Sequence, residues 1–254
     1  MKCLIRYILV FATLTIYTTN SAYGQGRIQR PHKSDQTISN HSNAVQQRLS
    51  TSDGYINSYG YIDLGLSSKT KWATCNLGSS SPTELGDFYS WGEITPKEHY
   101  TNDSYSLKNI SLGDVSGNER YDAATNLMGK EWHIPTIKQW KELQAECIFT
   151  SVVINGVKGV IVVGPNGNNI FLPVSGKMNQ HGHVEGSGAA RDNLPFESSS
   201  KYAECIFWSS TDNNDVENTY HISFSTYFEH PNMTDSFFWK WEGFQIRPVS
   251  SLSK

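Results

Sequence analysis

The middle of the chain contains the pattern that most constrains its fold, because it predicts consecutive antiparallel strands. Two runs rich in β-branched residues, Ser151–Ile154 and Val157–Val163, are separated only by Asn155 and Gly156. Asn and Gly accept the positive φ angles that a two-residue hairpin turn requires. A second turn, rich in Pro, Asn and Gly, leads into the apolar stretch Ile170–Leu172. We therefore predict a three-stranded antiparallel meander.

Helix signals are fewer, and one helix is marked clearly. Thr136 can cap its N-terminus, and Gln139, three residues later, completes the pattern of a capping box. At helical spacing, one face carries four apolar side chains: Ile137, Trp140, Leu143 and Cys147. A shorter helix is expected over residues 121–128. One or two helices packed on a twisted antiparallel sheet make an α+β fold.

The C-terminal third alternates with the two-residue period of a strand. We expect the residues of one parity to be buried: Tyr220, Ile222 and Phe224. The other parity would then form a polar outer face: His221, Ser223, Ser225 and Tyr227.

The next strand contains five bulky or charged residues in a row, Phe237–Trp241. Alternation cannot bury all five, so we expect some of Phe238, Trp239 and Lys240 to be exposed near His230. Aromatic rings beside polar groups are typical of surfaces that recognise sugars or proteins. The alternative is that these rings cap a second small core under the long stretch 177–202.

The first 24 residues have the order of a secretory signal peptide. Lys2 and Arg6 give a positive start, an apolar run follows, and small residues precede an expected cleavage near Gly24. The apolar run is too short to span a bilayer; an uncleaved anchor is the alternative.

Residues 25–58 are mostly polar, and we predict a flexible tether. Residues 59–250 are enough for one domain with its own core.

Removal of the signal changes the charge balance. The whole chain has 21 Lys and Arg against 24 Asp and Glu, and the first 24 residues hold two of the basic side chains and no acidic one. The mature chain would carry 19 basic and 24 acidic side chains, a net charge of −5. A nucleic acid or anionic membrane prefers a basic face, so neither is an expected partner. We predict a secreted protein (extracellular, cell-surface or periplasmic) with no membrane insertion after signal cleavage.

Five motifs occur in one order between Tyr61 and Val249. They are YIDLGLSSKTKWATCNLGSSSPTELGDFYSWGEITPK, GKEWHIPTIKQWKEL, NGNNIFLPVSG, FWSST and GFQIRPV. In this order they resemble the Fibrobacter succinogenes major paralogous domain, common in secreted proteins of gut Bacteroidetes. That family is related to the C-type-lectin-like fold, which also includes formylglycine-generating enzymes and hypervariable ligand-display proteins.

The resemblance implies a C-type-lectin-like domain whose N- and C-terminal strands pair, with Tyr61–Leu64 beside Phe244–Val249. It also implies a disulfide between Cys75 and Cys147, since the family often carries cysteines at these two places. Cys205 would then be a spare thiol, either buried and unreactive or paired with a partner chain. No reaction follows from the resemblance, because the fold serves many functions.

In the hypervariable relatives, the region between the WSS motif and the last strand displays the ligand contacts. The polar tip Asp212–Asp215 falls in this region. Its oxygens could bind calcium, but a hairpin turn satisfied by Asx hydrogen bonds is favoured. The predicted ligand-binding residues are Asp212, Asn213, Asn214, Asp215, His221, Tyr227, His230, Phe238 and Trp239.

Metal and catalytic sites are only weakly indicated. His181, His183 and Glu185 lie close together, but a closed metal site needs a fourth ligand. An extra His in the stretch 229–232 breaks the Glu-Pro-Asn motif of calcium-dependent lectins. Formylglycine-generating enzymes rely on cysteines near the C-terminus, and residues 207–254 contain none. We therefore expect no metal, no cofactor and no enzyme activity.

Two expectations concern the core. Five tryptophans lie within the family motifs and should be buried: Trp72, Trp91, Trp132, Trp140 and Trp208. Arg247 lies in a terminal strand, where an unpaired buried charge is costly. We expect its guanidinium to meet a carboxylate: Glu93, Asp87 or Asp63. The alternative is an edge strand with Arg247 in water.

Three classes of function remain. The leading one is a secreted, non-catalytic module that displays variable loops on a rigid scaffold and binds a glycan or a protein. The second is a structural or adhesive subunit of a cell-surface assembly, and the third is an enzyme of the formylglycine-generating type. Discrete hits on a glycan and protein array would favour the module. An array without hits, together with self-association of the chain, would favour the assembly.

Overall fold

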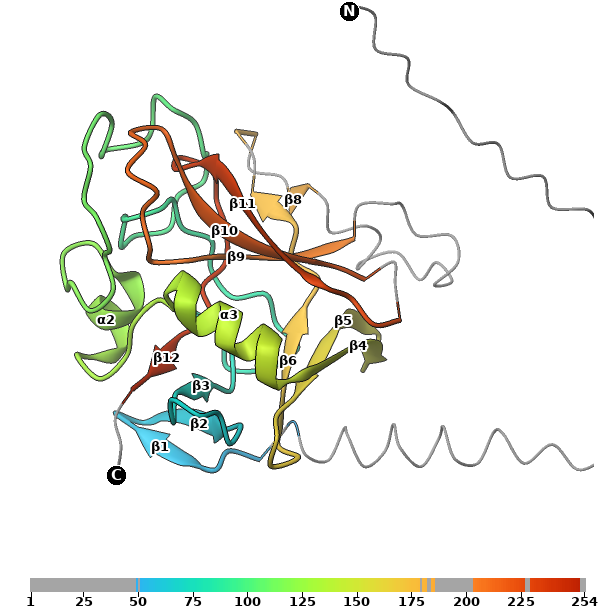
Figure 1. The fold of residues 1–254 in the computed structure, drawn as a ribbon. Coiled ribbons are helices and arrows are strands. Elements are labelled where there is room, and N and C mark those ends of the chain that lie inside the picture. Colours follow the sequence, from blue (N-terminus) through green and yellow to red (C-terminus); the bar gives the residue numbers. More distant parts are fainter. Residues whose placement is uncertain are drawn as a thin grey trace, which may run out of the picture.

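The computed structural model describes residue 49 and residues 51–178, 180–181, 184–185, 203–226 and 229–251. Within these residues the backbone forms antiparallel sheets of four, three, three and two strands, together with helices α2 and α3. Figure 1 shows α3 lying between the sheets. The predicted α+β class is therefore confirmed. No helix in these ranges combines the length and the apolar character needed to cross a bilayer.

The first sheet brings the two ends of the domain together. Its order is β1 (Gly54–Ile56), β2 (Tyr59–Asp63), β3 (Lys71–Ala73) and β12 (Val249–Ser250). The prediction that the first and last strands pair directly is wrong, because β3 lies between them. Trp72 of β3 is opposite Ile62 on one side and Val249 on the other. The short connection 64–70 folds β3 back along β2, which leaves the outer edge of β3 for the C-terminal strand.

Strand β1 lies inside the stretch predicted as a tether, residues 25–58. It forms a tight hairpin with β2, and the turn residues Asn57 and Ser58 have φ angles of 50° and 70°. Ile56 packs against a buried cluster, and its carbonyl accepts a hydrogen bond of 3.1 Å from Trp132 Nε1. The ordered domain therefore begins earlier than the predicted residue 59.

The predicted meander is confirmed. It consists of β4 (Ile148–Ile154), β5 (Val157–Val163) and β6 (Asn169–Pro173), each antiparallel to the next. The turn between β4 and β5 has Asn155 at φ 50° and Gly156 at φ 80°. These positive angles are the reason that Asn-Gly marks the hairpin in the sequence.

Both predicted helices are present. Helix α3 (Ile137–Glu146) starts with the expected capping box, in which Thr136 and Gln139 bond each other's backbone. The shorter helix α2 (Ala123–Met128) is capped by the buried side chain of Asp122, which accepts from Ala124 N at 2.9 Å.

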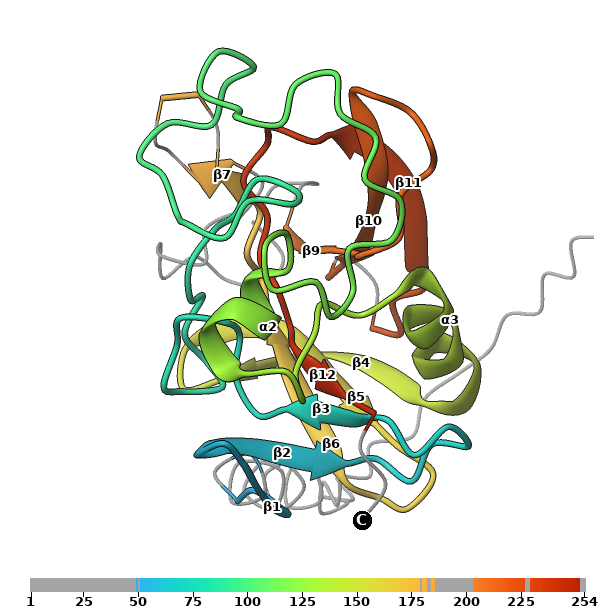
Figure 2. The same cartoon turned by 90° about the vertical axis from the view of Figure 1, so that its left-hand side faces the viewer.

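The sheet of the C-terminal third consists of β9 (Glu204–Trp208), β10 (Asn218–Ser225) and β11 (Met233–Trp239), in the order β11-β10-β9. A small hairpin joins β7 (Lys177–Met178) to β8 (Val184–Glu185). In both views β10 and β11 form a long ribbon on the side of α3 away from the first sheet (Figures 1 and 2).

Trp140 of α3 is at the centre of the main core. Its ring lies 4.8 Å from that of Trp72 and 5.6 Å from that of Phe207, so the helix joins the first sheet to β9. The burial of the five tryptophans is confirmed, with exposures of 0–1 %: Trp72, Trp91, Trp132, Trp140 and Trp208.

Candidate functional site

A row of aromatic side chains lies on one face of the β10–β11 hairpin. The ring of Tyr220 is 4.7 Å from that of Phe237, its cross-strand neighbour. The next outward position on β11 is Trp239, whose ring stacks on Trp241 at 5.2 Å and 11°. Phe237 and Trp239 are 52 % and 46 % exposed. We call Tyr220, Phe237, Trp239 and Trp241 the aromatic row.

The aromatic row is exposed because α3 covers only part of this sheet face. Ile222 and Phe224 of β10 lie in the main core, and Lys141 of α3 pairs with Asp235 at 3.0 Å. With 10 residues, α3 is about 15 Å long. The 8 residues of β10 extend about 27 Å. The end of the hairpin that carries Tyr220 and Trp239 therefore extends beyond the helix (Figure 2).

Burial of Tyr220 was expected from strict alternation, and that expectation is wrong. Tyr220 has the same parity as Ile222 and Phe224, but it is only half-buried. Parity determines the face of the sheet on which a side chain lies, whereas the length of the covering helix determines whether that face is buried. Tyr220 and Phe237 are thus site residues that the sequence interpretation missed.

A buried ion pair holds the polar tip against the end of β11. Lys240 Nζ lies 3.0 Å from Asp212 Oδ1 and 3.2 Å from Oδ2, and both side chains are 0 % exposed. The same ammonium donates to the Asp215 carbonyl at 2.6 Å and lies 4.7 Å from the Trp91 ring centroid. The Asp212 side chain is therefore engaged inside the protein and is not exposed. Exposure of Lys240, which alternation allowed, does not occur.

The rest of the tip is a turn closed by its own side chains. Asp215 Oδ1 accepts from the amides of Glu217 at 2.7 Å and Asn218 at 3.0 Å, and these bonds lower the pKa of Asp215. Asn213 Oδ1 accepts from the amide of Asp215 at 3.0 Å, and Asn214 has φ 64°. The favoured Asx-bonded turn is confirmed, since these oxygens are engaged with the backbone.

A small hollow lies beside the row. Its volume is about 180 Å³, and it is lined by Trp241 with Val216, Glu217 and residues of the 102–109 loop. Val216 is 44 % exposed. Four residues with a carboxylate, an ammonium or an amide group line the hollow together with Trp241: Glu217, Lys108, Asn102 and Asn109.

The structure does not place all of the predicted site residues together. His221 is buried at 8 % exposure, and burial lowers its pKa to about 4, so its predicted place on the exposed face is wrong. Its ring packs edge-on against Phe238, which is half-buried against Phe244. These rings fill the space under the face of β10 that was expected to be polar. Tyr227 lies outside the described residues.

His230 lies on the opposite face of the sheet from the aromatic row. It lines a polar hollow of about 310 Å³ together with Ser223, Ser225, Asn232, Thr234 and Glu204. His230 Nδ1 is 3.2 Å from the Phe149 carbonyl. Burial raises the pKa of Glu204, which the sequence interpretation did not single out.

The predicted disulfide is absent, because Cys75, Cys147 and Cys205 are all free thiols. Cys147 caps the end of α3 and packs against the main core, whereas Cys75 follows β3 and lines a hollow outside that core. Cys205 is completely buried and its thiol donates to the Leu172 carbonyl at 3.2 Å. Burial raises the pKa of Cys205, so it matches the unreactive alternative.

Arg247 is completely buried and meets no carboxylate among the described residues, so the expected carboxylate partner and the alternative of an edge strand in water are both wrong. Nε donates to Asn76 Oδ1 at 2.8 Å, and the two terminal nitrogens donate to the carbonyls of Ala73, Thr74 and Phe171 at 2.8–3.1 Å. The guanidinium therefore ties β3 and the loop after it to β6. Neutral oxygens take the place of the expected carboxylate.

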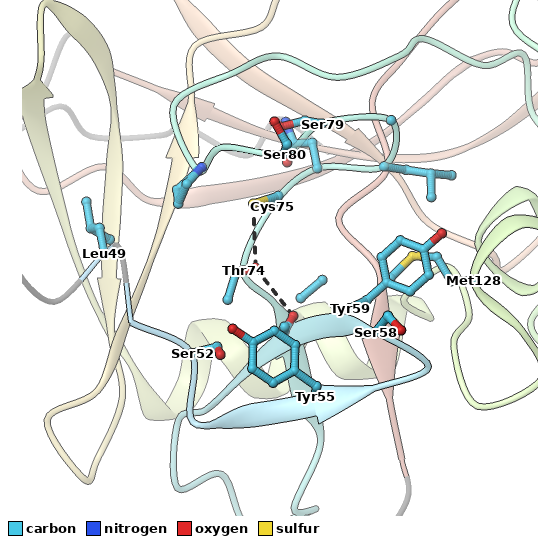
Figure 3. Close-up of a pocket in the computed structure, with 16 residues that line it drawn as sticks. Leu49, Ser52, Tyr55, Ser58, Tyr59, Thr74, Cys75, Ser79, Ser80 and Met128 are labelled. Carbon is cyan, nitrogen blue, oxygen red and sulfur yellow. Dashed lines mark hydrogen bonds between the residues drawn. The ribbon is translucent and has the colours of Figure 1, made fainter.

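A further hollow of about 400 Å³ opens beside the first sheet (Figure 3). It is bounded by the β1–β2 hairpin, by the stretch Thr74–Pro82 after β3, and by Met128 at the end of α2. Tyr55 and Tyr59 are 73 % and 42 % exposed. We call this hollow the tyrosine pocket.

Among the residues that the structure describes, no group of three or more His, Cys, Asp or Glu could hold a metal ion. His183 lies outside the described residues, and so do the side chains of Val184 and Glu185. Comparison with family models, with curated proteins and with solved structures finds no match to this chain.

Proposed function

We propose that this chain is a secreted, non-catalytic binding module whose recognition surface is the aromatic row. The ligand is a glycan or a protein surface. The observation that carries the proposal is the stacked pair of Trp239 and Trp241, which continues from Tyr220 and Phe237 on a face that α3 leaves uncovered.

The physical support is preorganisation. Large aromatic side chains provide most of the binding energy in many interfaces, and a rigid surface loses little entropy when it binds. Phe237 and Trp239 are on a paired strand. The buried Lys240–Asp212 ion pair joins the residue directly after β11 to the loop before β10, and so it fixes the chain next to the aromatic row. Neighbouring polar groups in the Trp241 hollow can hydrogen-bond a ligand that stacks on the rings.

The fold assignment within the α+β class belongs to the same proposal. The five ordered motifs support a C-type-lectin-like domain of the Fibrobacter succinogenes major paralogous type. The positive start and the short apolar run support secretion. In such a protein the residues before the domain would act as a tether that presents the aromatic row.

The test is a glycan and protein array, followed by titration of each hit against single variants. Trp239→Ala and Phe237→Ala should fold and lose most of the affinity. The matched control is Ile148→Ala, which removes an apolar side chain that is 66 % exposed on β4. Full affinity in both row variants would place the ligand elsewhere. An array without hits, combined with self-association of the chain, would favour a structural or adhesive subunit.

A further inference from the structure

The tyrosine pocket is a separate place from the aromatic row and its hollow, since they share no residue. Its volume of about 400 Å³ falls within the range of about 300–1,000 Å³ that is usual for small-molecule sites. The aromatic row is a surface, whereas this hollow could enclose a small ligand.

The lining of the pocket is uncharged. Of the described residues that form it, none is Asp, Glu, Lys, Arg or His. Hydroxyl groups come instead from several elements: Ser52, Tyr55, Ser58, Tyr59, Thr74, Ser79 and Ser80. An anionic ligand would lose hydration here without gaining an opposite charge, because the Glu84 carboxylate beside the pocket accepts from the Ser79 and Ser80 hydroxyls at 3.3 and 3.4 Å. The lining therefore disfavours an anion.

Hydrogen bonds join the residues at the floor of the pocket to their neighbours. Thr74 Oγ1 lies 3.4 Å from the Gly60 carbonyl and 3.5 Å from Cys75 Sγ (Figure 3). Asn76 Nδ2 donates to the Gln245 side chain at 2.9 Å. Arg247 lies beneath the floor and is 0 % exposed, and its donors are already bonded to protein oxygens. Its charge is thus not available to pair with a ligand.

The opening carries two tyrosine rings. Tyr55 and Tyr59 lie on the two strands of the β1–β2 hairpin and flank the hollow, with the serines close by (Figure 3). The Tyr59 hydroxyl donates to the Leu127 carbonyl at 3.3 Å, which holds that ring in place. The hydroxyls of Tyr55, Ser52 and Ser58 have no hydrogen-bond partner among the described residues.

We propose that the tyrosine pocket binds a neutral sugar unit. Pyranose rings present C–H faces that pack on aromatic rings and hydroxyls that both donate and accept hydrogen bonds, as the pocket hydroxyls do. This site does not depend on the aromatic row, and either could bind ligand without the other.

Cys75 provides the test, because this half-buried thiol lines the pocket. The rate of Cys75 alkylation by iodoacetamide is followed by peptide mass spectrometry with glucose, galactose, mannose, N-acetylglucosamine and their β-linked disaccharides. A sugar that fills the pocket slows this reaction by the factor 1 + [L]/Kd. Alkylation of Cys147, which lies outside the pocket, should not change. Glucuronate, a charged analogue of glucose, should protect far less than glucose.

Variants separate this site from the aromatic row. Tyr55→Ala should abolish the protection of Cys75, whereas Trp239→Ala should leave it unchanged. If Cys75 does not react in the free protein, saturation-transfer NMR of the same sugars compares the wild type with Tyr55→Ala. No protection and no saturation transfer from any neutral sugar would overturn the proposal, as would equal protection by glucuronate or an undiminished effect in Tyr55→Ala.

Discussion

Lys240 and Asp212 form an ion pair in which both side chains are completely removed from solvent, with Nζ 3.0 Å from the nearer carboxylate oxygen. Burial of two charges is costly and is offset only by good geometry and further bonds. Lys240 has these, through the Asp215 carbonyl and the Trp91 ring. The pair joins the tip after β9 to the end of β11, and so it fixes the edge of the aromatic row.

Removal of one partner of this pair should be strongly destabilising. Lys240→Met leaves the Asp212 carboxylate buried without its partner, and we expect a loss of about 3–5 kcal/mol in the free energy of unfolding. The double variant Lys240→Met with Asp212→Leu should recover most of that loss. Urea unfolding measures the free energy of unfolding of the single and the double variant. If the double variant is as unstable as the single one, the pair is not the source of the effect.

Trp140→Ala should cost about 3–5 kcal/mol, because it opens a cavity where α3 meets Trp72, Phe207 and Phe224. The matched control is Trp239→Ala, which removes the same side chain from a half-exposed position and should cost no more than about 1.5 kcal/mol, the usual contribution of an aromatic pair such as Trp239 on Trp241. Thermal or urea unfolding of the two variants checks the difference. Equal losses would contradict the assignment of core and surface.

Arg247→Lys should not be a conservative change. Lysine has three donors on one nitrogen and cannot reproduce the fork that bonds Asn76 and the carbonyls of Thr74 and Phe171. Buried acceptors left without donors cost about 1–3 kcal/mol each, so a loss of several kcal/mol is expected. Arg120→Lys, at an exposed position, is the control. Wild-type stability in Arg247→Lys would show that the guanidinium bonds are dispensable.

His221 should make the protein sensitive to acid. Burial lowers the pKa of His221 to about 4 in the folded state, below the ordinary value of 6.5. As the pH falls below 6.5 the unfolded chain takes up a proton that the folded chain does not, so stability decreases until about pH 4. The shift corresponds to a loss of about 3 kcal/mol from this residue. His221→Gln should lose less stability over this interval, and parallel pH profiles of the two proteins would contradict the assignment.

Local signals in the sequence predicted the elements well. Asn155-Gly156 and the Thr136–Gln139 capping box are decided by residues close in the chain, and both are present as expected. The five tryptophans were predicted to be buried because each lies in a family motif beside apolar or Gly residues, and all five are buried.

Features that depend on distant parts of the chain were predicted less well. The exposure of Tyr220 depends on where α3 ends, and the partners of Arg247 are carbonyls of β3 and β6, which no local pattern reveals. Lys240 lies in an aromatic run, but its burial depends on Asp212, 28 positions earlier. Cys75 and Cys147 were paired by resemblance alone, and they are free in this chain.

The role of the aromatic row is tested most directly by the affinity of Trp239→Ala for a ligand found on the array, measured beside the wild type and Ile148→Ala. Truncation of a central aromatic contact typically costs about 2 kcal/mol or more, which is roughly a 30-fold loss in affinity. We predict such a loss in Trp239→Ala and none in Ile148→Ala. Unchanged affinity in a folded Trp239→Ala protein would contradict the assignment of the aromatic row as the recognition surface.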